Sequence, residues 1–180
     1  MKQVSFYLVG NLTKLHHDSF IRFIETFNSK LNKEIVLYIN SAGGDSNVAT
    51  SIYLKLRNLK TKGTHITTIG DMNIKSGAFL IYLAGDIRLS YKDCTFMYHH
   101  HFKPLNFNIN LKDVATLNDF ISKEKLFEHA KVIEDNNKKM DDEISKITGI
   151  EKQGLRKLDN LDFDVQKAMK LNIVNKIITE

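Results

Sequence analysis

The chain has 180 residues, and 26 basic against 21 acidic residues give a formal net charge of +5. This length predicts one domain with a sizeable core, and 42% hydrophobic with 26% charged residues excludes a disordered or fibrous chain. The single cysteine, Cys94, excludes an intramolecular disulfide and a cysteine zinc cluster. The longest apolar run falls short of the roughly 18 residues of a membrane span. Basic and acidic residues alternate, which predicts a solvated surface and neither a nucleic-acid nor a membrane partner.

Short apolar runs with β-branched and aromatic residues predict strands, and apolar residues spaced three or four apart predict helices. In chain order we expect a strand at 4–9, a helix at 18–30, a strand at 34–39, a helix at 47–60, a strand at 65–69, a buried helix at 77–84, strands at 86–90 and 94–99, a long helix at 112–134, a helix at 164–171 ending at a left-handed Asn172, and a strand at 173–178. This alternation predicts an α/β fold of βαβ units with a mainly parallel sheet. Functional groups are then expected at the carboxyl ends of the strands.

Two glycines, Gly43 and Gly44, follow the strand at 34–39 and precede a helix. Glycines allow a tight turn and let backbone N–H groups approach a ligand oxygen. The same pair also fits a plain strand-to-helix turn. No G-x-G-x-x-G pattern supports a dinucleotide site, and we expect no cofactor.

Ser76 stands where the apolar helix at 77–84 begins. A serine in this position usually caps the helix by accepting a backbone hydrogen bond. The alternative is a nucleophile whose oxyanion is bound by amides of the helix N-terminus. The neighbouring Lys75 is read as a solvated charge.

Three consecutive histidines, His99, His100 and His101, begin at the last residue of the strand predicted at 94–99. Strand alternation sends His99 and His101 to one face and His100 to the other. No acidic or cysteine ligand accompanies them at metal-binding spacing, so we expect no metal site. A histidine that reaches a serine is a general base.

Five sequence blocks, in this order and spacing, resemble the proteolytic subunit of the Clp protease, in the Clp-protease/crotonase superfamily: YLVGNLT, LYINSAGGD, GAFLIYLAG, CTFMYHH and QKAMKLNIVNKII. The resemblance covers residues 4–178. It implies an α/β fold of stacked βαβ units, with the helix at 112–134 as a protruding handle. It also implies a single ClpP-like domain over 1–180 that lacks most of the family's N-terminal axial segment, which contacts the ATPase.

The resemblance implies the following site residues. Aligned without a gap on Gly77, the chain has Lys75 at the family's nucleophile position, and Ser76 reaches that position only after a one-residue shift. His99 falls at the family's catalytic base. The family's acid position falls on Arg156, with Asp159, Asn160 and Asp162 nearby but out of register. The oxyanion hole is assigned to Gly43, Gly44 and the amide of Ser76.

Three hypotheses follow from these substitutions. The first is a non-catalytic, ClpR-like ring subunit with a degenerate triad, working as a homo-oligomer or beside an active paralogue, with or without a Clp-type ATPase. The second is an active serine endopeptidase that uses Ser76 and His99. The third is a crotonase-type relative that acts on acyl thioesters. ClpR-like subunits imply a plastid-type stroma or a bacterial cytoplasm as the location.

Overall fold

The computed structural model describes residues 2–27, 32–100 and 123–179. Within these ranges the strands form one sheet, in the order β1-β2-β3-β4-β7, with β5 paired to β3 and to β6. The strands are β1 (Lys2–Val9), β2 (Asn32–Ser41), β3 (His65–Lys75), β4 (Ile87–Tyr91), β5 (Thr95–Tyr98), β6 (Leu161–Asp164) and β7 (Lys176–Ile178). The helices are α1 (Lys14–Thr26), α2 (Ser46–Thr61), α3 (Gly77–Tyr82), α5 (Lys123–Thr148), α6 (Lys152–Leu158) and α7 (Val165–Lys170).

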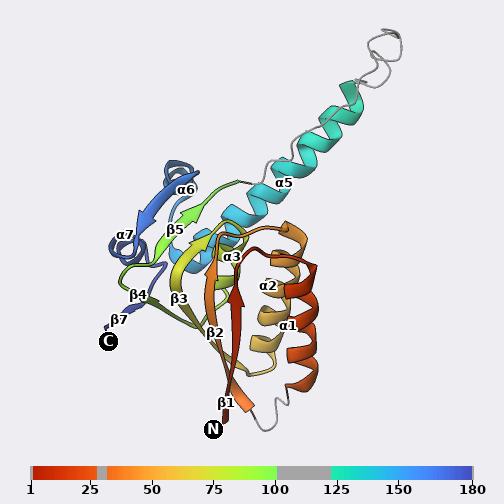
Figure 1. Cartoon of the computed structure of the whole chain (residues 1–180). Helices are drawn as coiled ribbons and strands as arrows, with labels where there is room; N and C mark the ends of the chain where they lie inside the picture. The colour runs from red at the N-terminus through yellow and green to blue at the C-terminus, as the bar shows by residue number, and fades with distance from the viewer. Residues whose placement is uncertain (1, 28–31, 101–122, 180) are drawn as a thin grey trace.

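The predicted α/β fold with a mainly parallel sheet is confirmed, because every strand pairing is parallel except that of β5 with β6. α1 and α2 lie together along one side of the sheet, and α5 projects away from its end (Figure 1). The left-handed conformation expected for Asn172 is also found, with φ 54°. In the described parts of the chain, no helix is long and apolar enough to span a membrane.

Some boundaries differ from the prediction. α5 continues to Thr148, beyond the expected 112–134, because Met140, Ile144 and Ile147 extend the apolar spacing into the core. Residues 112–122 of the predicted handle, and 28–30 of the predicted first helix, lie outside the described residues. The short α6 and β6 were not predicted.

The core lies between the sheet and the helices. The internal strand β2 buries consecutive residues on both faces, Ile35, Val36 and Leu37, as is usual for a strand covered on both sides. From α2, Ile52 and Leu56 face the sheet and are fully buried. The Asp45 carboxylate caps this helix by accepting from Asn47 and Val48, which fixes the start of α2 beside the glycine turn.

β3 pairs with two different strands along its length. Its first part, Thr67–Gly70, pairs with β4, and its last part, Asn73–Lys75, pairs with β5. The ends of β3 and β5 therefore lie side by side. Because Ser76 and His99 directly follow these two ends, the sheet brings residues distant in sequence together.

Candidate active site

Ser76 forms a strained turn between β3 and α3. Its backbone angles are φ 54° and ψ −125°, a region that non-glycine residues occupy at a cost of about 1–3 kcal/mol. The N–H of Ser76 donates to the Met97 carbonyl at 2.9 Å, which ties the turn to β5. The Ser76 side chain makes no capping hydrogen bond to α3, so its interpretation as a helix cap is wrong.

The Ser76 hydroxyl instead faces His99. Ser76 Oγ lies 2.7 Å from His99 Nε2, and His99 Nδ1 lies 2.8 Å from the carbonyl oxygen of His100. A carbonyl only accepts hydrogen bonds, so Nδ1 carries the ring proton and Nε2 is left to accept from the serine. A neutral imidazole held in this tautomer beside a serine hydroxyl has the geometry of a general base next to its nucleophile.

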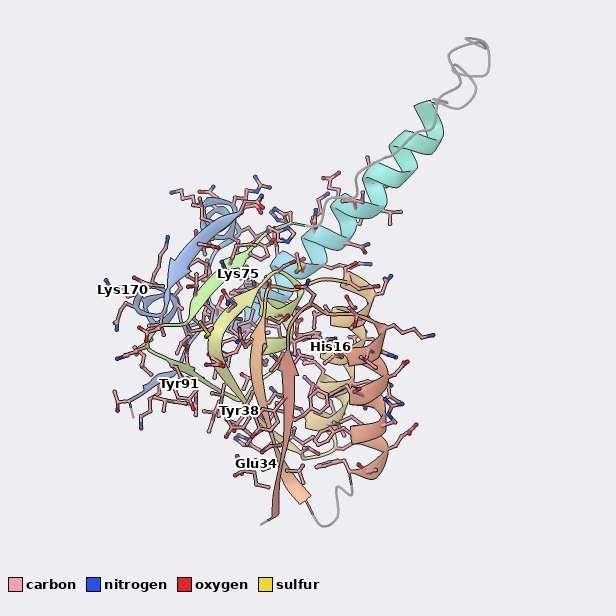
Figure 2. The ribbon with its side chains drawn as sticks, in the orientation of Figure 1. His16, Glu34, Tyr38, Lys75, Tyr91 and Lys170 are labelled. Carbon is pink, nitrogen blue, oxygen red and sulfur yellow. The ribbon has the colours of Figure 1, made fainter. Side chains whose placement is uncertain are left out.

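Lys75 points elsewhere, so the geometry gives no support to its predicted place at the nucleophile position, which stays a prediction. Its Nζ lies 2.7 Å from Asp162 Oδ2 on β6, so it is an ion-paired side chain rather than a free charge. Lys75 and Ser76 therefore have different side-chain partners, Asp162 and His99. Lys75 lies at the end of the sheet near the base of α5 (Figure 2).

The segment that follows α5 approaches the histidines through Asp159, not through Arg156. Arg156 is exposed on α6 because Leu155 and Leu158 turn the other side of this short helix into the core. Asp159 ends α6, and its carboxylate accepts from the backbone N–H and the ring of His100. The assignment of Arg156 to the acid position stays a prediction without support from this geometry, and Asp159 is the nearby acid that contacts His100.

The glycine turn lies directly against Ser76. Gly43 has φ +94°, and a Cβ at this position would lie 2.6 Å from the Ser76 Cβ. The N–H of Gly43 donates to Ser41 Oγ at 3.1 Å. Because the Ser76 N–H is also taken, by Met97, two of the three predicted oxyanion donors are committed within the fold.

Gly44 stays a prediction as an oxyanion donor. It has φ +142° and forms an isolated parallel bridge with Leu12, where a Cβ would lie 2.5 Å from the Leu12 carbonyl oxygen. Gly77, the first residue of α3, is a further candidate donor, which the sequence indicated only as an amide of the helix N-terminus without naming the residue. The first N–H groups of a helix have no acceptor within it, and this one directly follows the serine. The strand-to-helix turn is the sequence feature that indicates this candidate donor.

A small pocket opens beside the Ser76–His99 pair. Its walls come from α2, α3, β5 and the base of α5, and most of its side chains are apolar. The lining residues are Ser46, Ala49, Thr50, Ser76, Gly77, Phe79, Leu80, Tyr98, His99, Met140 and Ile144. The pocket holds only about 10 Å³, room for about one water molecule, so its apolar walls offer a contact surface beside the serine rather than space for a whole side chain.

Among the described residues, no group of three or more His, Cys, Asp or Glu side chains is placed to share a metal ion. His101 lies outside the described residues. Cys94 is buried, as predicted, and burial raises the pKa of its thiol to about 11. The thiol is therefore protonated at neutral pH and is not a competing nucleophile.

Comparison with known proteins identifies the family. The family model described as Clp protease matches residues 2–180. The chain belongs to the Clp protease family. It is 24% identical over 176 residues to the ATP-dependent Clp protease proteolytic subunit 2 of Treponema pallidum (strain Nichols), a match that covers 95% of this chain and 80% of the relative.

Solved structures of Clp protease subunits share the fold. ClpP1 from Listeria monocytogenes matches with a TM-score of 0.68, and a mutant form of the same protein with 0.76. Both are 20% identical, and each match covers 98% of this chain and 91% of the other. The recognition of a Clp-type fold from the sequence blocks is confirmed.

The position of Lys75 in this Clp family chain leads to a first prediction. Lys75→Ala is expected to change the rate at which a phosphonate modifies the serine less than about fivefold, because partly exposed ion pairs contribute only about 0–1 kcal/mol. The side chains of the pair are 20% and 57% exposed. The labelling reaction is stopped at set times, and intact-mass spectrometry measures the modified fraction, which gives the rate. A loss of labelling in this variant would show that Lys75 takes part in activating the serine.

Proposed function

We propose that the protein is an active serine-type peptidase subunit of the Clp family, with Ser76 as nucleophile and His99 as general base. One observation carries the proposal: the 2.7 Å contact between Ser76 Oγ and His99 Nε2 at a strained strand-to-helix turn. Backbone strain of this kind persists where surrounding structure holds it and clusters at active sites. The second sequence-based hypothesis is thereby favoured over the non-catalytic one.

The proposed reaction is acyl transfer through the serine. Ser76 Oγ attacks the carbonyl carbon of a peptide bond while its proton passes to His99 Nε2. The tetrahedral oxyanion is bound by backbone N–H groups, for which Gly77 and Gly44 are the candidates. His99 then gives its proton to the leaving amine, the C–N bond breaks, and an acyl-enzyme remains. Water, deprotonated by His99, hydrolyses this ester and restores the serine.

The pocket points to the substrate class. Ala49, Phe79, Leu80, Met140 and Ile144 line it next to the reacting serine. These apolar walls favour a peptide with an apolar side chain on the acyl side of the cleaved bond, which would contact them at the mouth of the pocket. Peptides with a charged side chain at this position are expected to react poorly.

A non-catalytic, ClpR-like ring subunit is the second candidate, and one observation favours it. His99 Nδ1 donates to a backbone carbonyl and not to a carboxylate. A carbonyl fixes the tautomer, but it stabilises the imidazolium less than a negative charge does. The thioester hypothesis needs no serine nucleophile, and the Ser76–His99 contact gives it no support.

The assembly is also a proposal. The Treponema pallidum relative is named as a subunit of an ATP-dependent protease. By analogy we propose that this chain forms rings, alone or with a paralogue, and works with a Clp-type ATPase. Its location in a plastid-type stroma or a bacterial cytoplasm is proposed on the same analogy.

Serine labelling tests the proposed activity. Diisopropyl fluorophosphate reacts with an activated serine, forming an O–P bond and releasing fluoride. The folded protein is expected to gain one phosphoryl adduct, located on Ser76 by peptide mass spectrometry, and Ser76→Ala is expected to remove it.

Ser51→Ala is the matched control for this labelling. Ser51 Oγ also lies near a histidine, 3.0 Å from His17 Nε2, but it stands in the middle of α2 without a strained turn. This variant should label like the wild type. An unlabelled wild-type protein would support the non-catalytic candidate instead.

A further inference from the structure

His100 lies between two carboxylates at the edge of the active site. Its Nδ1 is 3.1 Å from Asp159 Oδ2, and its Nε2 is 3.1 Å and 3.2 Å from the two carboxylate oxygens of Asp141. The backbone N–H of His100 donates to Asp159 Oδ1 at 2.9 Å. We call these three residues the His100 clamp.

The His100 clamp connects three elements that are far apart in the sequence. Asp141 belongs to α5 and is almost completely buried, and Asp159 follows α6. Tyr98 of β5 donates its hydroxyl to the same Asp141 carboxylate. Burial and that hydrogen bond raise the pKa of Tyr98, so its hydroxyl stays protonated as a donor. Backbone and ring of His100 are therefore both held in place.

The clamp bears directly on the catalytic base. The carbonyl that accepts from His99 Nδ1 is that of His100 itself. The direction of this carbonyl depends on the backbone angles of His100, which the clamp restrains through the N–H and the ring. We infer that His100, held between Asp141 and Asp159, is a positioning residue that orients His99 for catalysis, and that it does so in its protonated state. This inference rests on the proposed peptidase function.

The contacts require a charged ring. Carboxylates only accept hydrogen bonds, and a neutral imidazole has one N–H, so it can satisfy one carboxylate and not both. Burial lowers the pKa of His100, but the hydrogen bonds to Asp141 and Asp159 outweigh burial and hold the pKa above its ordinary value of 6.5. Among the described residues, the titratable groups that face the ring are Asp141, Asp159 and Tyr98.

The upward shift of the His100 pKa sets the direction of the pH effect. A raised pKa in the folded state means that the clamp stabilises the protein fully below about pH 6.5 and is lost as the pH rises through the raised value. Serine reactivity should therefore fall at alkaline pH, when His100 loses its proton and releases one carboxylate. At acid pH it should also fall, because a protonated His99 is no base.

The test is the pH dependence of the second-order rate of labelling by diisopropyl fluorophosphate. The wild type is expected to show both an acid and an alkaline limb. His100→Gln should lower the rate about 10- to 100-fold through misplacement of the base, and should remove the alkaline limb. Asp141→Asn should move the alkaline limb to lower pH, because one of the two carboxylates that favour the charged ring is gone.

Glu143→Gln is the matched control, since Glu143 lies on the same helix but contacts Tyr53 and Arg57 instead. It should keep the wild-type profile, and circular dichroism should show all variants folded. An alkaline limb that survives His100→Gln, or an Asp141→Asn profile equal to that of Glu143→Gln, overturns this inference alone. A wild type that fails to label at every pH overturns the proposed function and this inference with it.

Discussion

Replacing Ser76 with alanine is expected to lower kcat for peptide cleavage by about 10⁴- to 10⁶-fold, the loss seen when a serine nucleophile is removed. The side chain supplies the attacking oxygen, and no other hydroxyl lies at hydrogen-bond distance from His99 Nε2 among the described residues. The fold should persist, because the Ser76 contacts that hold the turn are made by its backbone. A fluorogenic peptide with an apolar residue before the cleaved bond gives the measurement.

A double variant sharpens this prediction. His99→Ala alone should cost nearly as much as Ser76→Ala, and the two changes together should cost no more than either one, because nucleophile and base act as a unit. Ser51→Ala, which removes the surface Ser–His pair, should leave kcat unchanged. Additive losses from Ser76→Ala and His99→Ala would mean that the two residues do not work as one pair.

Gly43→Ala is expected to lower kcat at least about 100-fold and to lower the free energy of unfolding by about 1–3 kcal/mol. The added methyl group would lie 2.6 Å from Ser76 Cβ and 3.0 Å from its Oγ, so the nucleophile must move. The left-handed φ of +94° adds strain for any residue with a Cβ. Peptide cleavage and urea unfolding measure the two effects separately.

Gly63→Ala separates crowding from backbone strain. Gly63 has a similar φ of +85°, but a Cβ there would meet nothing within 4 Å. This variant should lose stability and keep its activity. Equal activity of Gly43→Ala and the wild type would show that the glycine turn does not confine the serine.

Local patterns account for most of the fold. Strands β1 to β3 were predicted from runs of consecutive apolar residues, and the helices between them from apolar residues spaced three or four apart. The resemblance in five blocks then predicted the family from the same segments. α6 and β6 were missed because their order depends on distant partners: β6 exists by pairing with β5, and its own sequence, LDFD, has one buried residue.

The site was predicted less completely than the fold. His99 and Ser76 were both named as candidates from the sequence. The ungapped alignment nevertheless put Lys75 at the nucleophile position, because a one-residue shift at a turn cannot be seen in the sequence. Asp159 was set aside for the same reason, since the length of α6 decides which residue reaches the histidines. The N–H groups of Gly43 and Ser76 looked free in sequence, whereas loop and strand contacts use them.

The double pairing of β3 also bears on when the proposed Ser76–His99 pair can form during synthesis. The serine turn is held by β5, whose own edge is completed by β6, close to the end of the chain. A ribosome-bound chain that has emerged only as far as Ser76 therefore carries the nucleophile without the base or the hydrogen bond that holds its backbone in place. For the proposed peptidase, we therefore expect serine reactivity only after β5 and β6 have been synthesised.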